Sequence, residues 1–165
     1  MPEDVRRGVR VGVDVGSVRV GVARSDPAGV LATPVRTVRR TAATDGVAEI
    51  AQIVRDEDAI EIVVGLPRSL SGARGRAAQE ALAYAMRLAE VVRPVPVRLV
   101  DERLTTVTAH QALRRSGRDG RRQREVVDQV AAVLILQSAL ETERGTGKPA
   151  GELIETEAGG GEDEP

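Results

Sequence analysis

Hydrophobic residues of this chain gather in short runs in which valine dominates. The runs at residues 10–13 and 19–23 are rich in β-branched side chains and show no helical period, which is typical of buried strands. The short link between these two runs predicts a hairpin. The same pattern predicts five strands in all, over residues 10–13, 19–23, 30–38, 59–64 and 97–100.

Apolar residues at helical spacing predict helices between and after these strands. The predicted helices cover residues 46–55, 77–92 and 122–143, with a shorter one over residues 105–115. The element order β-β-β-α-β-α-β-α begins with a meander and continues with crossovers. It therefore predicts an α/β fold with one mixed five-stranded sheet and helices on both faces. Pro34 removes a ladder donor, which indicates an edge position or a bulge for the third strand.

The length of 165 residues favours a single domain. We expect residues 9–144 to form this domain, after a flexible N-terminus at residues 1–8. Residues 145–165 are rich in glycine and contain one lysine and six acidic residues, which predicts a disordered acidic tail. The rest of the chain carries more basic than acidic side chains, an arrangement common among nucleic-acid-binding proteins.

The inventory of reactive side chains narrows the chemistry. The chain has no cysteine, its single histidine is His110 and its only lysine is Lys148. Thiol nucleophiles and thiolate zinc sites are excluded, and a Walker-A lysine or a histidine-based triad is difficult to build. Carboxylates and arginines remain, which favours chemistry with carboxylate-bound Mg²⁺ or Mn²⁺. No apolar run approaches the length of a membrane span, so we expect a cytoplasmic protein with no membrane partner.

Acidic residues stand at three places where acids are poor structural choices. Asp14 ends the first strand, Asp101 and Glu102 end the fifth, and Asp128 lies early in the last helix on a stripe of small apolar residues. With the first strand central, these carboxylates can converge around a divalent cation that relieves their repulsion. Two such metals activate a water and stabilise the leaving oxygen of a phosphodiester. In the alternative interpretation, Asp14 caps the turn at Gly16 and Asp128 favours the helix N-terminus electrostatically.

Asp101 and Glu102 project to opposite faces of their strand, so we expect only one of them to be a ligand. Alternation groups Asp101 with Leu99, and Glu102 with Val100. The strand by itself leaves the choice between the two acids open.

Arginines are concentrated on either side of these acids. Arg118, Arg121 and Arg122 belong to a basic stretch before the last helix, and Arg68 opens the loop after the fourth strand. Guanidinium groups bind phosphate in a bidentate manner. The alternative is surface decoration by salt bridges. Phe and Trp are absent, so recognition of a structured duplex or junction through its backbone is favoured over base stacking.

Four short motifs follow one another along the chain. They are Asp14-Val-Gly16 with Arg19-Val-Gly21-Val-Ala23, Gly65-Leu66-Pro67, Asp101-Glu102-Arg103-Leu104-Thr105-Thr106, and Asp128 before Ala131-Ala132. Together they resemble the YqgF/RuvX family over about residues 10–140. Members of this family have a ribonuclease-H-like fold, are similar to Holliday-junction resolvases and are assigned as pre-16S rRNA nucleases.

The resemblance implies that Asp14, Glu102 and Asp128 are the catalytic, metal-binding acids. It also implies that three arginines are substrate contacts, namely Arg19, Arg68 and Arg103. This chain departs from the family pattern at Ser17-Val18, where many members have a basic residue.

We therefore expect a nuclease that depends on Mg²⁺ or Mn²⁺ and processes the ends of pre-16S rRNA. The alternatives are a Holliday-junction resolvase acting on branched DNA and a non-catalytic nucleic-acid-binding module. The implied partners are structured RNA or branched DNA and a ribosomal precursor particle. The sequence is compatible with a monomer or a homodimer.

Overall fold

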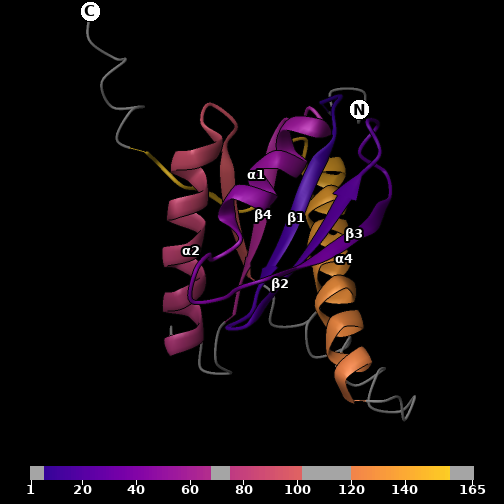
Figure 1. Cartoon of the computed structure of the whole chain (residues 1–165). Coiled ribbons are helices and arrows are strands. Elements are labelled where there is room, and N and C mark those ends of the chain that lie inside the picture. The colour runs from indigo at the N-terminus through magenta and orange to yellow at the C-terminus, as the bar shows by residue number, and fades with distance from the viewer. Residues whose placement is uncertain (1–5, 68–74, 102–119, 157–165) are drawn as a thin grey trace, which may run out of the picture.

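The computed structural model describes residues 6–67, 75–101 and 120–156, with side chains at all of these except 120–128. The element labels are those of Figure 1. The strands are β1 (Arg10–Val15), β2 (Arg19–Ser25), β3 (Ala32–Arg39), β4 (Glu61–Leu66), β5 (Val97–Asp101) and β6 (Glu152–Leu153). The helices are α1 (Val47–Asp56), α2 (Arg76–Val92) and α4 (Gly120–Thr146).

The strands form one mixed sheet in the order β3-β2-β1-β4-β5-β6. β1 pairs in parallel with β4, and β4 in parallel with β5, whereas β2, β3 and β6 run antiparallel to their neighbours. β1 therefore lies inside the sheet with the long parallel strand β4 on one side and the hairpin partner β2 on the other. The predicted α/β fold with helices on both faces is confirmed.

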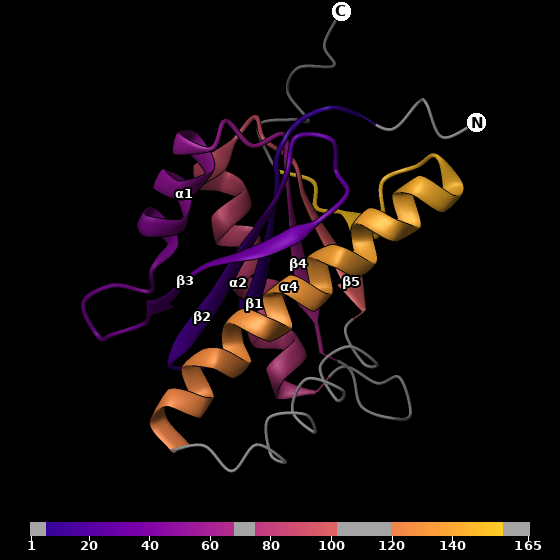
Figure 2. The same ribbon diagram turned by 90° about the vertical axis from the view of Figure 1, so that its right-hand side faces the viewer.

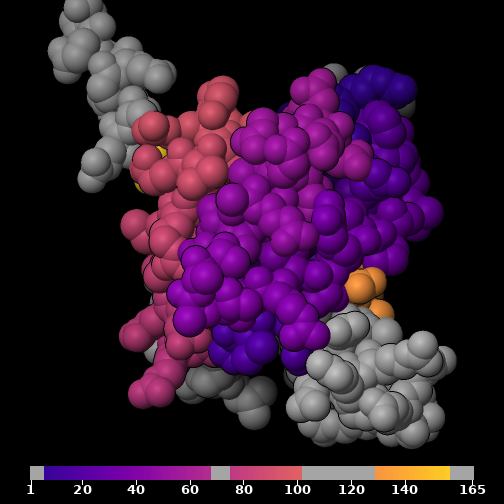
Figure 3. All heavy atoms as spheres, viewed as in Figure 1, coloured from indigo at the N-terminus to yellow at the C-terminus, as the bar shows by residue number. Residues whose placement is uncertain are grey.

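The two faces of the sheet are covered by different helices. α1 and α2 lie side by side on one face, as Figures 1 and 3 show, and α4 crosses the other face obliquely (Figure 2). Val11, Val13 and Val64 face the α1 and α2 side, where they belong to the larger buried cluster. Ala23 and Val63 face α4 and pack with Ile135. Alternation along each strand thus decides which side chains lie under α4.

Gly12 brings α4 close to β1. A Cβ atom added at Gly12 would lie 2.7 Å from Cβ of Leu136 and 3.0 Å from the carbonyl oxygen of Ala132. Any larger residue would push the helix outward. Gly12 is therefore required for the close contact of the helix with the central strand.

The described residues contain six strands where the sequence predicts five. The additional strand β6 lies in the segment 145–165, for which the sequence predicts disorder. Glu152 pairs with Leu99, and the amide of Ile154 donates to the carbonyl of Val97 at 2.9 Å. A strand of two residues has no detectable period, which explains why the pattern does not predict it. The predicted helix over residues 105–115 lies outside the described residues.

Ion pairs close the edge of the sheet where β1 and β4 begin. Arg10, Glu61 and Glu143 are each less than 5% exposed. Arg6 lies 2.9 Å from Glu61 and 2.8 Å from Glu143, and Arg10 lies 3.2 Å from Glu143. These contacts join the N-terminal segment, β1 and β4 to the end of α4.

Candidate active site

The opposite edge of the sheet carries Asp14 and Arg19, the predicted site residues whose side chains are described. β1, β4 and β5 are parallel, so their carboxyl ends meet at this edge, the lower one in Figure 1. β2 runs antiparallel to β1 and therefore begins at this edge. β3 is antiparallel to β2, so it runs in the same direction as β1 and ends there. Ligands of open α/β sheets gather at such carboxyl ends.

Asp14 lies near the end of β1 and is half-buried. It shares its strand face with Gly12, and therefore faces the side of α4. Its paired residue on β2 is Gly21. On the other side, the register of β1 with β4 ends at Val13 and Val64, and one more residue along each strand brings Gly65 next to Asp14. Neither of these two neighbours carries a side chain. Asp14 is therefore a half-buried carboxylate on the sheet face that α4 covers, and it has an interaction partner of its own.

The turn after Asp14 is closed by its own backbone. The amide of Gly16 donates to the carbonyl of Arg19 at 2.8 Å. The Gly16 amide thus has a partner other than the Asp14 carboxylate. This contact weighs against the alternative interpretation, in which Asp14 serves to cap the turn at Gly16.

Asp101 belongs to the other face of the sheet. It follows the alternation of Val97 and Leu99, which are buried in the cluster under α1 and α2, and it is exposed at the end of β5. Asp14 faces α4 instead. Glu102 lies outside the described residues, so its assignment as a ligand stays a prediction.

Position 128 lies in the part of α4 that passes over Asp14. The side chain of Gln129 donates to the hydroxyl of Thr37 on β3 at 3.0 Å. Thr37 is paired with Gly21, and Gly21 with Asp14, so these residues stand at one level of the sheet. The backbone of Asp128 is adjacent to Gln129 at this level, whereas its side chain is outside the described part. In the chain with described side chains, no three acidic or histidine residues form a possible metal site.

Of the predicted arginines, Arg19 is the one whose side chain is described. Arg19 begins β2, is half-buried and is paired directly with Arg39 of β3. Alternation places both on the face of Asp14, because Thr37, two residues before Arg39, contacts α4. Both arginines have interaction partners of their own. Sequence reasoning missed Arg39, since it depends on the register of two strands.

The other predicted substrate contacts are not placed. Three of them lie outside the described residues, namely Arg68, Arg103 and Arg118. Arg121 and Arg122 lie in the first turn of α4 without described side chains. Their role as nucleic-acid contacts stays a prediction.

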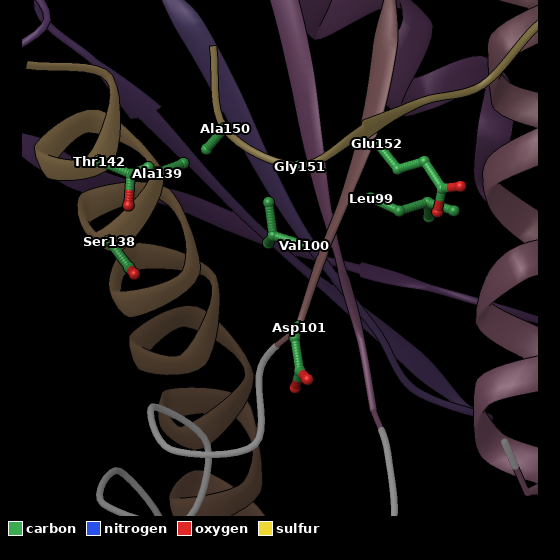
Figure 4. Close-up of a pocket in the computed structure, with 9 residues that line it drawn as sticks. All are labelled: Leu99, Val100, Asp101, Ser138, Ala139, Thr142, Ala150, Gly151 and Glu152. Carbon is green, nitrogen blue, oxygen red and sulfur yellow. The ribbon is translucent and has the colours of Figure 1, made fainter. Parts of the chain in front are cut away.

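A pocket of about 390 Å³ lies between β5, β6 and α4 (Figure 4). Ser138 and Thr142 present hydroxyls to it from successive turns of α4, and Asp101 stands at one end. Its lining includes Asp101 and Glu152 but no basic residue. The pocket therefore does not suit a phosphate group.

Comparison with known proteins decides the family. A model of the RuvX family, described as Holliday junction resolvase, matches residues 8–142. The chain belongs to the RuvX family.

Several similar relatives of this RuvX protein carry the same name. A Nocardioides protein named "Putative pre-16S rRNA nuclease" is 58% identical over 92% of this chain and 99% of its own length. Proteins of the same name from Streptomyces avermitilis and Thermobifida fusca are each 54% identical over 92% of this chain and 97% and 98% of their own lengths. The structure resembles Thermus thermophilus RuvC in complex with Holliday junction substrate. That match has a TM-score of 0.52, 16% identity, and coverage of 87% of this chain and 99% of RuvC. The ribonuclease-H-like fold is thereby confirmed.

The described helices of this RuvX protein include none that is both long enough and apolar enough to cross a membrane.

Proposed function

We propose that this RuvX protein is a metal-dependent nuclease that hydrolyses phosphodiester bonds of pre-16S rRNA. The observation that carries the proposal is the placement of Asp14, a half-buried carboxylate at the end of an interior strand with Gly21 and Gly65 as its neighbours. A carboxylate in such a position can offer its oxygen atoms to a hard divalent cation. The names of relatives that are 53–58% identical support the choice of pre-16S rRNA.

The donor set fits a hard divalent cation. Asp14, Glu102 and Asp128 would hold Mg²⁺ or Mn²⁺, which prefer carboxylate oxygens. Of the adjacent acids Asp101 and Glu102, Glu102 is the better candidate, because Asp101 belongs to the face away from Asp14. A bound metal would supply the positive charge that activates a water and stabilises a leaving oxygen.

The chain's own residues would hold the substrate by its phosphates. Arg19 is on the face of Asp14. The sequence supplies further basic residues that we propose as phosphate contacts, namely Arg68, Arg103, Arg118, Arg121 and Arg122. Tyr84, the only Phe, Tyr or Trp residue of the chain, is fully buried. The chain therefore offers no exposed ring of these three types for base stacking, and we infer recognition of structured RNA through its backbone.

A ribosomal precursor particle is the partner that this substrate implies. The resemblance to RuvC favours a second candidate, resolution of branched DNA, through the fold. Binding of nucleic acid without cleavage is the third candidate function.

Cleavage assays separate these three functions. We expect the wild-type protein with Mg²⁺ or Mn²⁺ to shorten a pre-16S RNA fragment at its ends, and a four-way DNA junction to be cut much more slowly. Faster cleavage of the junction would favour the resolvase. Tight binding of both substrates with no cleavage, by wild-type and Asp14→Asn proteins alike, would contradict the enzyme and favour the binding module.

A further inference from the structure

The ring of Tyr84 lies close to two guanidinium groups. Tyr84 comes from α2 and is fully buried. The guanidinium carbon of Arg40 lies 5.0 Å from the ring centroid, and that of Arg87 lies 5.4 Å away. Cations at such distances over an aromatic face are attracted by it. The single aromatic ring of the chain thus packs against Arg40, the residue that follows β3.

Hydrogen bonds at Asp45 hold the ring of Tyr84 in place. Its hydroxyl donates to the carbonyl of Asp45 at 2.8 Å, and Arg87 donates to the carboxylate of Asp45 at 2.9 Å. Burial raises the pKa of Tyr84 above its ordinary value, so the hydroxyl stays a neutral donor. Arg40 therefore stacks on a ring that has little freedom to move.

Arg40 connects this ring to the turn beside Asp14. Its Nη1 donates to the carbonyl of Gly16 at 2.7 Å, and its backbone amide donates to the carbonyl of Val18 at 2.8 Å. A Cβ atom on Gly16 would lie 2.6 Å from the carbonyl oxygen of Arg19, so the turn is tight. Arg40 bonds to both ends of the segment 16–18, which separates Asp14 from Arg19.

We propose that Arg40, backed by the ring of Tyr84, is a positioning residue that fixes the turn 16–18 and thereby the placement of Asp14 and Arg19. The proposal rests on the proposed nuclease function. Displacement of a reacting group by about 1 Å can lower a rate by as much as a hundredfold. The contact between Arg40 and Gly16 is therefore expected to act on the rate of cleavage.

The alternative is that Arg40 contacts a phosphate directly, and Tyr84 separates the two roles. Tyr84 is fully buried and cannot touch a substrate. If Arg40 positions the turn, Arg40→Gln and Tyr84→Leu should both lower kcat by roughly tenfold or more with little change in KM. Tyr84→Phe, which keeps the ring, should retain most of kcat. Arg87→Ala is the matched control, because Arg87 stacks on the same ring and bonds to Asp45 rather than to the hairpin.

Hydrogen exchange at residues 14–20 gives a readout that does not depend on cleavage. We expect faster amide exchange there in Arg40→Gln and Tyr84→Leu than in the wild-type protein and in Arg87→Ala. Unchanged exchange in Arg40→Gln would overturn the proposal, even if the protein proves to have no nuclease activity. A raised KM in Arg40→Gln with wild-type kinetics in folded Tyr84→Leu would also overturn it, in favour of a phosphate contact. Should Tyr84→Leu not fold, the exchange measurement on Arg40→Gln decides alone.

Discussion

Asp14 lies between two strand neighbours that have no side chains, Gly21 on β2 and Gly65 on β4. A third glycine, Gly12, stands two residues before it on β1. The three glycines have different roles at the scale of single residues. Gly21 and Gly65 place no side chain next to Asp14, whereas Gly12 lets α4 approach β1. The sequence predicts the acid from its position after an apolar run. It does not distinguish the glycines, because their roles depend on which elements lie across from them.

The substitution Gly12→Ala tests the close contact of α4. The added Cβ would lie 2.7 Å from Cβ of Leu136, so helix and strand must separate. We expect a loss of about 1–3 kcal/mol in the free energy of unfolding and a Tm lower by roughly 2–10 °C. Gly75→Ala is the control, since no atom lies within 4 Å of its added Cβ. Equal melting temperatures of the two variants would show that α4 adapts without cost.

At the scale of elements, the valine-rich strands and the amphipathic helices α1 and α2 are predictable, because burial imposes periods of two and 3.6 residues on them. The pairing of Arg39 with Arg19 is not. It depends on the register of β2 with β3, which shifts at a bulge between Val22 and Ala23. A shift of one residue changes the face on which a side chain lies, and no local pattern reports it.

The pairing of β2 with β3 predicts that replacing Arg39 and replacing Arg36, both on β3, will affect RNA binding differently. Arg39 shares the face of Asp14, whereas Arg36 is on the opposite face and pairs with Glu49 at 3.1 Å. We expect Arg39→Gln to weaken RNA binding and to reduce the slope of log K against log salt by about one. Arg36→Gln should leave the slope unchanged. Equal slopes for the two variants would indicate that RNA does not cross this part of the sheet.

The C-terminal end of α4 gives a stability prediction that depends on pH. The hydrogen bond from Arg6 holds the pKa of Glu143 below its ordinary value of 4.5. The ionised form is thus favoured in the folded protein, and its contribution is present above pH 4.5 and lost as the pH falls through the lowered pKa. Glu143→Gln leaves Arg10 buried without its anionic partner, which costs on the order of 3 kcal/mol at neutral pH.

Thermal denaturation checks this prediction. For Glu143→Gln we expect a Tm lower by roughly 6–12 °C at neutral pH and a weaker decline of stability in acid than in the wild-type protein. Glu141→Gln, an exposed position on the same helix, is the control. A steep acid decline that persists in Glu143→Gln would assign the acid sensitivity to other carboxylates.

At the scale of the whole molecule, the two edges of the sheet at which β1 and β4 begin and end have different roles, one in stability and one in the candidate active site. The edge where β1 and β4 begin is closed by buried ion pairs and fixes the end of α4. The edge where they end carries Asp14, Arg19 and Asp101 and has glycines beside the central carboxylate. The sequence predicts both the fold and this edge, since parallel strands bring their carboxyl ends together. It could not supply the contact of Arg40 with Tyr84, which joins residues 44 positions apart through tertiary packing.

The most direct measurement is metal-dependent cleavage of a pre-16S RNA fragment by four proteins, the wild type, Asp14→Asn, Glu102→Gln and Asp101→Asn. We expect Asp14→Asn and Glu102→Gln to fold normally and to lose cleavage with both Mg²⁺ and Mn²⁺. Asp101→Asn should still cleave, because Asp101 belongs to the strand face away from Asp14. Loss of cleavage in Asp101→Asn alone would place the metal on the other face of the sheet. Wild-type cleavage by Asp14→Asn would contradict the assignment of this edge as the active site.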